Sequence, residues 1–187
     1  GSRAPLIIVS ATKGIEAETL ARMSRVSAEE CERAGTPARF AALSGPTFAA
    51  ELARAVPSAA VVASADVALA AERRETLASP TLRLYSSADV VGVELAGAAK
   101  NVIAIGAGVV SGLGMGHNTL AALITRGLHE ITRLGLAYGG DPKTDALLED
   151  VLAGSVAEAD ALPLVWAEWR AGMAALRAAG AFGPSVQ

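Results

Sequence analysis

The chain has 187 residues, of which 52% are hydrophobic and only 4% aromatic, and its formal net charge is -3. This length suits one domain with a proper core or two small domains. The scarcity of aromatic residues predicts a core of small, closely packed side chains. The acidic balance and the scattered charges argue against a basic surface that binds nucleic acid.

A single cysteine, Cys31, excludes an intrachain disulfide framework and suits a reducing compartment. The longest run without a charged residue or histidine, residues 101–116, is too short to cross a bilayer, so we expect no membrane span.

The first 86 residues alternate between short apolar runs and stretches of helical composition. Residues 6–9 (LIIV) form a continuous apolar run, which is typical of a buried parallel strand. Residues 16–34 have helical composition and are followed by Gly35, Thr36 and Pro37, which stop helices. The same reasoning predicts strands at 6–9, 40–43, 59–63 and 82–86, and helices at 16–34, 48–56 and 66–77. This order of elements indicates an α/β domain.

The pattern changes after Asp89, where apolar residues recur at three- and four-residue spacing. This period predicts two amphipathic or buried helices, over about 95–113 and 120–134. Two more helices are predicted at 145–153 and 161–179. The chain therefore divides into an α/β part, residues 1–88, and an all-α part, residues 89–187.

The stretch KNVIAIGAGVVSGLGMGHN, residues 100–118, allows two interpretations. A dinucleotide-binding loop needs G-x-G-x-x-G/A between a strand and a helix, but Ser111 stands at the third position after Gly106 and Gly108. Glu130 has about the spacing of the acidic residue of that fingerprint, yet it lies within a helical pattern. A helix is favoured, although each internal glycine costs about 1 kcal/mol relative to alanine. Such glycines are tolerable where another helix or a ligand packs closely against them.

Lys100 is the only charged residue between Glu94 and Arg126, so its amine lies on a mostly apolar helix. One interpretation is a lysine that extends from the helix flank to solvent. The other is a catalytic base. Burial or a second cation lowers the pKa of a lysine, which then accepts a proton from an alcohol as a hydride leaves the same carbon.

Two loops predict a site for that base. Lys13 lies just past the first predicted strand, at the sheet edge where ligands bind in open α/β folds. The segment SGPT, residues 44–47, follows the second predicted strand. It is either a turn with a helix cap, or a place where Gly45 lets a substrate approach backbone N–H groups. Together with Lys100, the two loops predict a pocket for an anionic substrate between the sheet and the helical part.

Several longer segments resemble one enzyme family. VSATKGIE, LSGPTFAAELA, GAAKNVIAIGAGVVSGLGMGHN, ALITRGLHEI and GGDP are similar to the bacterial NAD(P)-dependent glycerol-3-phosphate dehydrogenases, over about Leu6 to Pro142. The resemblance implies the C-terminal part of a Rossmann-like parallel sheet, followed by a helical domain of the 6-phosphogluconate-dehydrogenase-like C-terminal type. It also implies a cytoplasmic, homo-oligomeric enzyme of phospholipid synthesis that interconverts sn-glycerol 3-phosphate and dihydroxyacetone phosphate with NAD or NADP.

The resemblance further implies roles for individual residues. Lys100 of AAKN would be the catalytic proton acceptor, or the donor in the reverse direction. Lys13 of ATKG would contact both the cofactor and the substrate. No metal ligand is implied. The implied substrate-binding residues are Lys13, Gly45, Thr47 and Asn101, and the implied cofactor-binding residues are Lys13 and Ala49.

The chain also departs from the family pattern. The strand–GxGxxG–helix unit that holds the dinucleotide pyrophosphate is absent, as are the GLGDL segment and the S-R-N-R run after GGDP, and Ser111 replaces an acidic residue. We therefore expect weak NAD(P)H binding, slow or no turnover, and oligomerisation through an uncovered sheet edge. Two other functions stay open: a catalytically silent association module of the family, and a related hydroxy-acid dehydrogenase. Neither the choice between NAD and NADP nor a role for residues 145–187 follows from the sequence.

Overall fold

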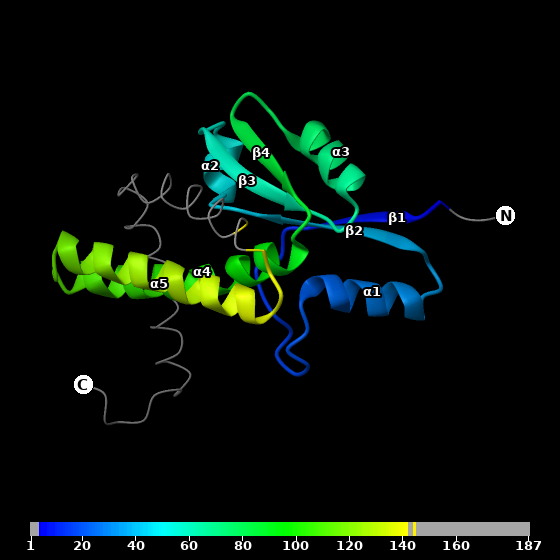
Figure 1. Ribbon diagram of the computed structural model, residues 1–187. Helices are drawn as coiled ribbons and strands as arrows, with labels where there is room; N and C mark the ends of the chain where they lie inside the picture. Colours follow the sequence, from blue (N-terminus) through cyan, green and yellow to red (C-terminus); the bar gives the residue numbers. More distant parts are fainter. Residues whose placement is uncertain (1–3, 142–143, 145–187) are drawn as a thin grey trace, which may run out of the picture.

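The computed structural model describes residues 4–141 and Thr144, and Figure 1 shows a sheet with helices on both of its faces. Within the described residues the sheet has four strands in the order β1-β2-β3-β4, so neighbours in sequence are also neighbours in space. The strands are β1 Leu6–Ser10, β2 Ala38–Ser44, β3 Ser58–Ala63 and β4 Leu82–Ser87. The four predicted strands are therefore confirmed, with β1 and β4 at the two edges.

The sheet is mixed rather than wholly parallel. β1 pairs with β2, and β3 with β4, in parallel, but β2 and β3 are antiparallel. The connection between them explains the reversal. Its helix, α2 Ala49–Ala53, has five residues and spans only about 8 Å, whereas the seven-residue β2 is about 23 Å long. Because the chain does not return to the start of β2, it re-enters the sheet in the opposite direction. The Rossmann-like α/β class is confirmed, with this pairing as the difference.

Four longer helices accompany the sheet in the described part of the chain. They are α1 Met23–Arg33, α3 Val67–Leu77, α4 Val90–Gly112 and α5 His117–Ala137. α4 and α5 confirm the two helices that apolar spacing predicted after Asp89. The helices predicted at 145–153 and 161–179 lie outside the described residues.

Two predicted helices are shorter than expected because the backbone turns out of helical geometry. α1 starts at Met23 because Leu20 has a positive φ of 56° and the chain closes a turn through a bridge between Ile15 and Arg22. α2 ends early because Ala55 also has a positive φ, of 58°. An L-residue rarely adopts this conformation, and neither apolar spacing nor composition reveals it.

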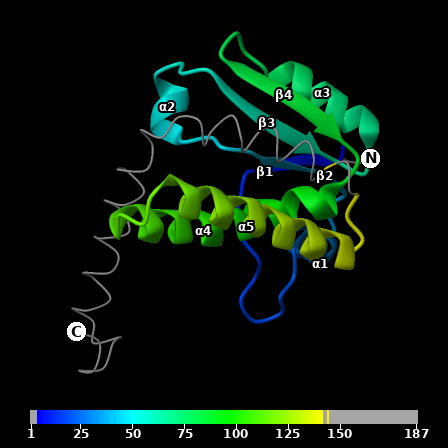
Figure 2. The same ribbon diagram turned by 60° about the vertical axis from the view of Figure 1, so that its left-hand side comes forward.

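Two apolar clusters lie on opposite faces of the sheet, because successive strand residues point to opposite sides. The first cluster is Ala42, Val61, Ala63, Val93, Ala96 and Ile131, and the second is Ala41, Ala60, Val62, Leu69 and Leu84. α3 covers one face, while α1, α4 and α5 lie on the other (Figures 1 and 2). Alanine and valine dominate both clusters, which agrees with the predicted core of small side chains.

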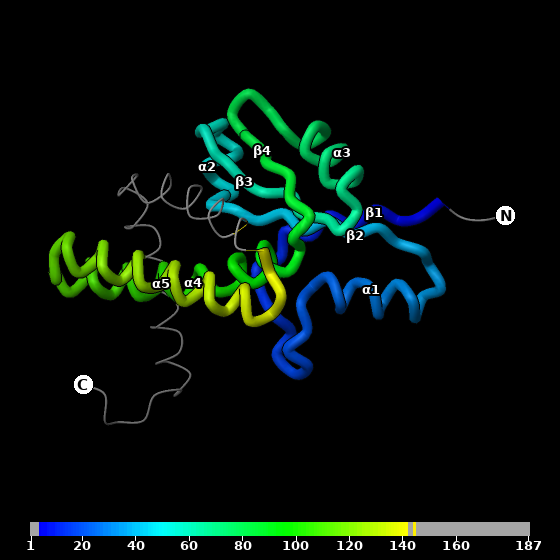
Figure 3. Tube along the Cα trace, viewed as in Figure 1, coloured from blue at the N-terminus to red at the C-terminus, as the bar shows by residue number. Residues whose placement is uncertain are grey.

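α4 and α5 run side by side as an antiparallel hairpin (Figure 3). Gly106 and Gly108 lie inside α4, so the helix interpretation is confirmed and the glycine-loop alternative is wrong. The close neighbour is a helix: a β-carbon on Gly106 would lie 3.2 Å from Leu123 Cδ2 of α5. By length and composition alone, α4 is a candidate for crossing a membrane, although core helices pass the same test. Its first turns are buried against the sheet.

Gly127 of α5 is packed against Ile103 of α4. A β-carbon at Gly127 would meet Ile103 Cδ1 and lie 2.8 Å from its Cγ1. We expect Gly127→Ala to lower the free energy of unfolding by about 1–2 kcal/mol, because overpacking outweighs the gain in helix propensity. Gly106→Ala is the matched control and should be nearly neutral, since the flexible end of Leu123 can yield. Urea unfolding followed by circular dichroism measures both, and equal losses would contradict the packing argument.

Candidate active site

Lys13 and Thr47 come together at the sheet edge where β1 and β2 end. The two strands are parallel, so the loops that follow Ser10 and Ser44 leave from the same edge. The Nζ of Lys13 lies 3.5 Å from Oγ1 of Thr47, which is at the limit of a hydrogen bond. Both side chains are half-buried. The two loops therefore meet, as their order along the chain predicted.

Lys100 reaches the same place from α4. Its Nζ donates a hydrogen bond of 3.0 Å to the backbone carbonyl of Gly45, across a sequence separation of 55 residues. The Lys100 side chain is half-buried. It is therefore directed at the loop after β2 and does not simply extend from the helix flank into solvent.

The surroundings of Lys100 lower the pKa of its amine. Burial is the largest cause that lowers the pKa of its amine from 10.5 to about 8, and the positive charge of Lys13 and contact with its side chain lower it further. An amine with a pKa of about 8 is neutral in about one molecule in ten at pH 7. A neutral amine can accept a proton, so Lys100 can act as a base under ordinary conditions.

Two glycines allow the elements of this site to approach one another. A β-carbon on Gly97 would lie 2.6 Å from Ser44 Oγ, so the bare backbone of α4 packs on the end of β2. A β-carbon on Gly45 would lie 2.8 Å from the carbonyl oxygen of Ala59 in β3. These contacts fix the position of the Gly45 carbonyl to which Lys100 donates.

The two remaining predicted residues have exposed side chains. Asn101 follows Lys100 on α4, and Ala49 is the first residue of α2, shortly after Thr47. The structure therefore places the two lysines and the SGPT segment in contact, with Asn101 and Ala49 next to them along the chain. The roles of all these residues toward a substrate or a cofactor stay predictions.

Comparison with known families accounts for both halves of the chain. A family model described as the N-terminus of NAD-dependent glycerol-3-phosphate dehydrogenase matches residues 2–70, and a model of its C-terminus matches residues 89–157. The chain belongs to the NAD-dependent glycerol-3-phosphate dehydrogenase family. The second match extends past Pro142, where the sequence resemblance was expected to end.

Individual members of the family support this assignment. The glycerol-3-phosphate dehydrogenase (NAD(P)+) of Geobacter metallireducens is 53% identical over 142 residues, which cover 74% of this chain and 41% of that relative. The enzyme of the same name from Acidobacterium capsulatum is 52% identical over 137 residues, covering 73% and 40%. A crystal structure of glycerol-3-phosphate dehydrogenase from Coxiella burnetii is 36% identical with a TM-score of 0.68, covering 75% of this chain and 42% of the other. The chain thus spans about 41% of the length of the curated relatives it matches.

The described residues do not fit the pyrophosphate of NAD or NADP. Among residues 4–141, no strand is joined to a helix by a G-x-G-x-x-G loop, which is the usual cradle. The connection from β1 to α1 contains Gly14 alone, and the connection from β3 to α3 contains no glycine. Within the same part of the chain, no group of three or more His, Cys, Asp and Glu residues is placed to hold a metal ion.

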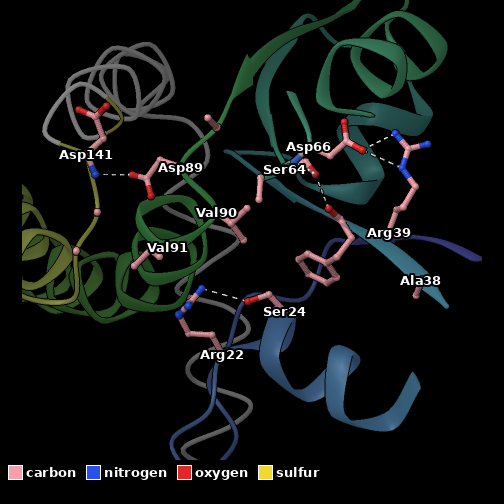
Figure 4. A pocket seen from close by; sticks show the side chains of 15 residues that line it. Arg22, Ser24, Ala38, Arg39, Ser64, Asp66, Asp89, Val90, Val91 and Asp141 are labelled. Carbon is pink, nitrogen blue, oxygen red and sulfur yellow. Dashed lines mark hydrogen bonds and ion pairs between the residues drawn. The ribbon is translucent and has the colours of Figure 1, made fainter. Parts of the chain in front are cut away.

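A hollow of about 770 Å³ lies at the opposite end of β2 from the lysines (Figure 4). Two arginines line it, and both are already paired: Arg39 with Asp66, and Arg22 with Glu94 of α4. Each arginine charge is therefore balanced by a carboxylate, whereas Lys13 and Lys100 bring two like charges together. The pair of Arg22 and Glu94 was missed in the sequence, although an acidic residue within an apolar helix was the available signal.

Proposed function

We propose that this chain carries the substrate and proton-transfer site of a dehydrogenase that interconverts sn-glycerol 3-phosphate and dihydroxyacetone phosphate. The observation that supports this most is the half-buried Lys100, whose pKa is lowered to about 8 beside Lys13. Both lysines lie in segments that match the family models. A related hydroxy-acid dehydrogenase is less well supported, because the matches include both parts of the chain.

The proposed chemistry concerns the secondary alcohol of glycerol 3-phosphate. Its oxidation removes a proton from oxygen and a hydride from carbon. Neutral Lys100 takes the proton from the hydroxyl, and in the reverse direction its ammonium form returns the proton to the ketone oxygen. Lys13 has two effects: its charge favours the neutral form of Lys100, and it attracts the phosphate of the substrate.

The substrate is held by groups around the two lysines. The hydroxyl of Thr47 and the backbone around Gly45 offer hydrogen bonds at the edge of the sheet, and the Asn101 amide lies next to the base on α4. Lys13 and Ala49 would lie against the nicotinamide cofactor, NAD or NADP. The reaction needs such a cofactor as hydride acceptor, and the described residues lack its pyrophosphate cradle.

A second candidate is an association module of the same family without activity of its own. The edge strand β1 favours it, because Leu6 is 51% exposed and Ile7 38% exposed on a strand that has one neighbour among the described strands. In either case we place the protein in the cytoplasm as a homo-oligomer. Light scattering of the 187-residue chain tests the oligomeric state, and a monodisperse monomer would contradict the proposed homo-oligomer.

Calorimetric titration with sn-glycerol 3-phosphate tests the proposed site in the intact chain. We expect glycerol 3-phosphate to bind, and we expect no binding of glycerol, which has no phosphate. Lys13→Ala should raise the dissociation constant of glycerol 3-phosphate about 10- to 100-fold, because a charge-assisted contact is lost. Arg133→Ala removes an exposed cation of α5 and serves as the control without effect. No binding of glycerol 3-phosphate by the unaltered chain would overturn the proposal.

An NADH assay with the same chain separates an enzyme from a silent module. We expect slow or no NADH formation from glycerol 3-phosphate and NAD+, because the described residues lack the glycine loop. Steady formation that Lys100→Ala abolishes would contradict this expectation and would establish the chain as an enzyme. Formation that Lys100→Ala leaves unchanged would exclude Lys100 as the base.

A further inference from the structure

Glu94 is a buried carboxylate on α4 that the proposed chemistry does not use. Its side chain is 5% exposed. Its Oε2 accepts hydrogen bonds from Arg22 Nη1 and Ser24 Oγ, and its Oε1 accepts one from the backbone N–H of Ser24, each at 2.6 Å. Short, charge-assisted bonds of this kind are stronger than neutral ones. A carboxylate buried without them would be strongly destabilising, so this contact fixes α1 against α4.

The contact caps α1 from another helix. The N-cap residue of α1, Arg22, makes no capping hydrogen bond with its own side chain. Ser24 lies in the first turn, where backbone N–H groups have no partner inside the helix. The Glu94 carboxylate supplies the missing acceptor and places a negative charge at the positive end of the helix dipole.

The same contact joins the two segments that carry the lysines of the proposed site. Lys13 belongs to the segment that runs from β1 to α1, and Lys100 belongs to α4 together with Glu94. We propose that Glu94 is a positioning residue, which sets the approach of Lys13 to Lys100 by holding the start of α1 on α4. This inference rests on the proposed function of the two lysines.

The path of the segment that contains Lys13 explains why the contact between Glu94 and the start of α1 matters. Between β1 and α1 the chain projects away from the sheet and turns back before α1 (Figure 3), and a bridge between Ile15 and Arg22 closes this turn. The sheet holds this segment at one end through β1, and Glu94 holds it at the other. Without Glu94, the segment and α4 can separate. Water then reaches Lys100, and the charge of Lys13 moves away from it.

Titration of the lysine amines tests the inference without a substrate. The chain has three lysines, Lys13, Lys100 and Lys143, so reductive methylation with labelled formaldehyde gives few signals in a carbon-13 NMR spectrum. Lys→Arg variants of the full chain assign them. The pKa of Lys100 is then read directly in each variant. Because neither substrate nor cofactor is present, the result is independent of whether the chain is active.

We expect Glu94→Ala to raise the pKa of Lys100 from about 8 to about 9 or more. Glu94→Gln keeps one acceptor oxygen for Ser24 and should give a smaller rise. Glu30→Gln, which removes an exposed acid paired with Arg33 on α1, is the control and should leave the pKa unchanged.

A folded Glu94→Ala chain with an unchanged Lys100 pKa would overturn the positioning role and leave Glu94 as a purely structural contact. Where Glu94→Ala fails to fold, Glu94→Gln and Ser24→Ala decide instead, and an unchanged pKa in both counts against the inference. A raised pKa together with absent glycerol 3-phosphate binding would support the positioning of the lysines while overturning their proposed function.

Discussion

Replacing Lys100 with methionine is expected to stabilise the chain at pH 7 by about 1–2 kcal/mol more than at pH 10.5. The folded-state pKa of Lys100, about 8, lies below its ordinary value of 10.5. Between these two pH values the unfolded chain retains a proton that the folded chain has released. Unfolding therefore takes up a proton, and the free energy of unfolding of the lysine form rises with pH through this window. The methionine form has no such dependence at this position.

The magnitude follows from the size of the shift. A lowering from 10.5 to about 8 corresponds to about 3 kcal/mol at full burial. Lys100 is only half-buried, and solvent screening reduces the value to the expected 1–2 kcal/mol. Urea unfolding of both chains across this pH range measures it, with Arg133→Met as a control for introducing methionine on an exposed surface. A difference between the lysine and methionine forms that stays constant with pH would show that the folded protein does not favour the neutral amine.

The sequence predicts much of this site because its parts follow strand ends. Lys13 and the SGPT segment each come directly after an apolar run, and parallel strands that end together place their loops together. Lys100 was predicted from a different signal, one charge on an apolar helix. The hydrogen bond from Lys100 to Gly45 was not predictable, because it depends on how closely α4 packs against the end of β2.

The parts that sequence reasoning missed depend on contacts between distant residues. Glu94 is separated by 70 residues or more from its partners at the start of α1. An acidic residue within an apolar helix marks Glu94, but nothing in the sequence indicates which residues it contacts. The antiparallel direction of β3 is set by the short connection from β2, whereas its apolar run suits a strand in either direction. The late start of α1 results from the positive φ of Leu20, which leucine does not favour. In each case a local pattern predicts the element, and tertiary geometry decides its direction, length or partner.

Gly45→Ala is expected to lower the free energy of unfolding by about 3 kcal/mol. The new β-carbon would lie 2.8 Å from both the Ala59 carbonyl oxygen and the Ala60 Cα, which are backbone atoms of β3. Backbone within a sheet cannot yield by changing a rotamer, because its hydrogen-bonded neighbours would have to move with it. The substitution must therefore either push β3 away from the end of β2 or shift the loop that carries the Gly45 carbonyl.

Gly14→Ala is the matched control for this prediction. Gly14 also follows a strand at the same edge, and a β-carbon there would meet nothing within 4 Å, so its effect should stay within about 0.5 kcal/mol. The carbonyl of Gly45 accepts the hydrogen bond from Lys100. In the reductively methylated chain, Gly45→Ala should therefore also move the carbon-13 NMR signal of the Lys100 amine, and Gly14→Ala should not. Equal loss of stability in the two variants would mean that the close approach of β3 does not require glycine. An unmoved Lys100 signal in Gly45→Ala would mean that this carbonyl does not hold the amine in place.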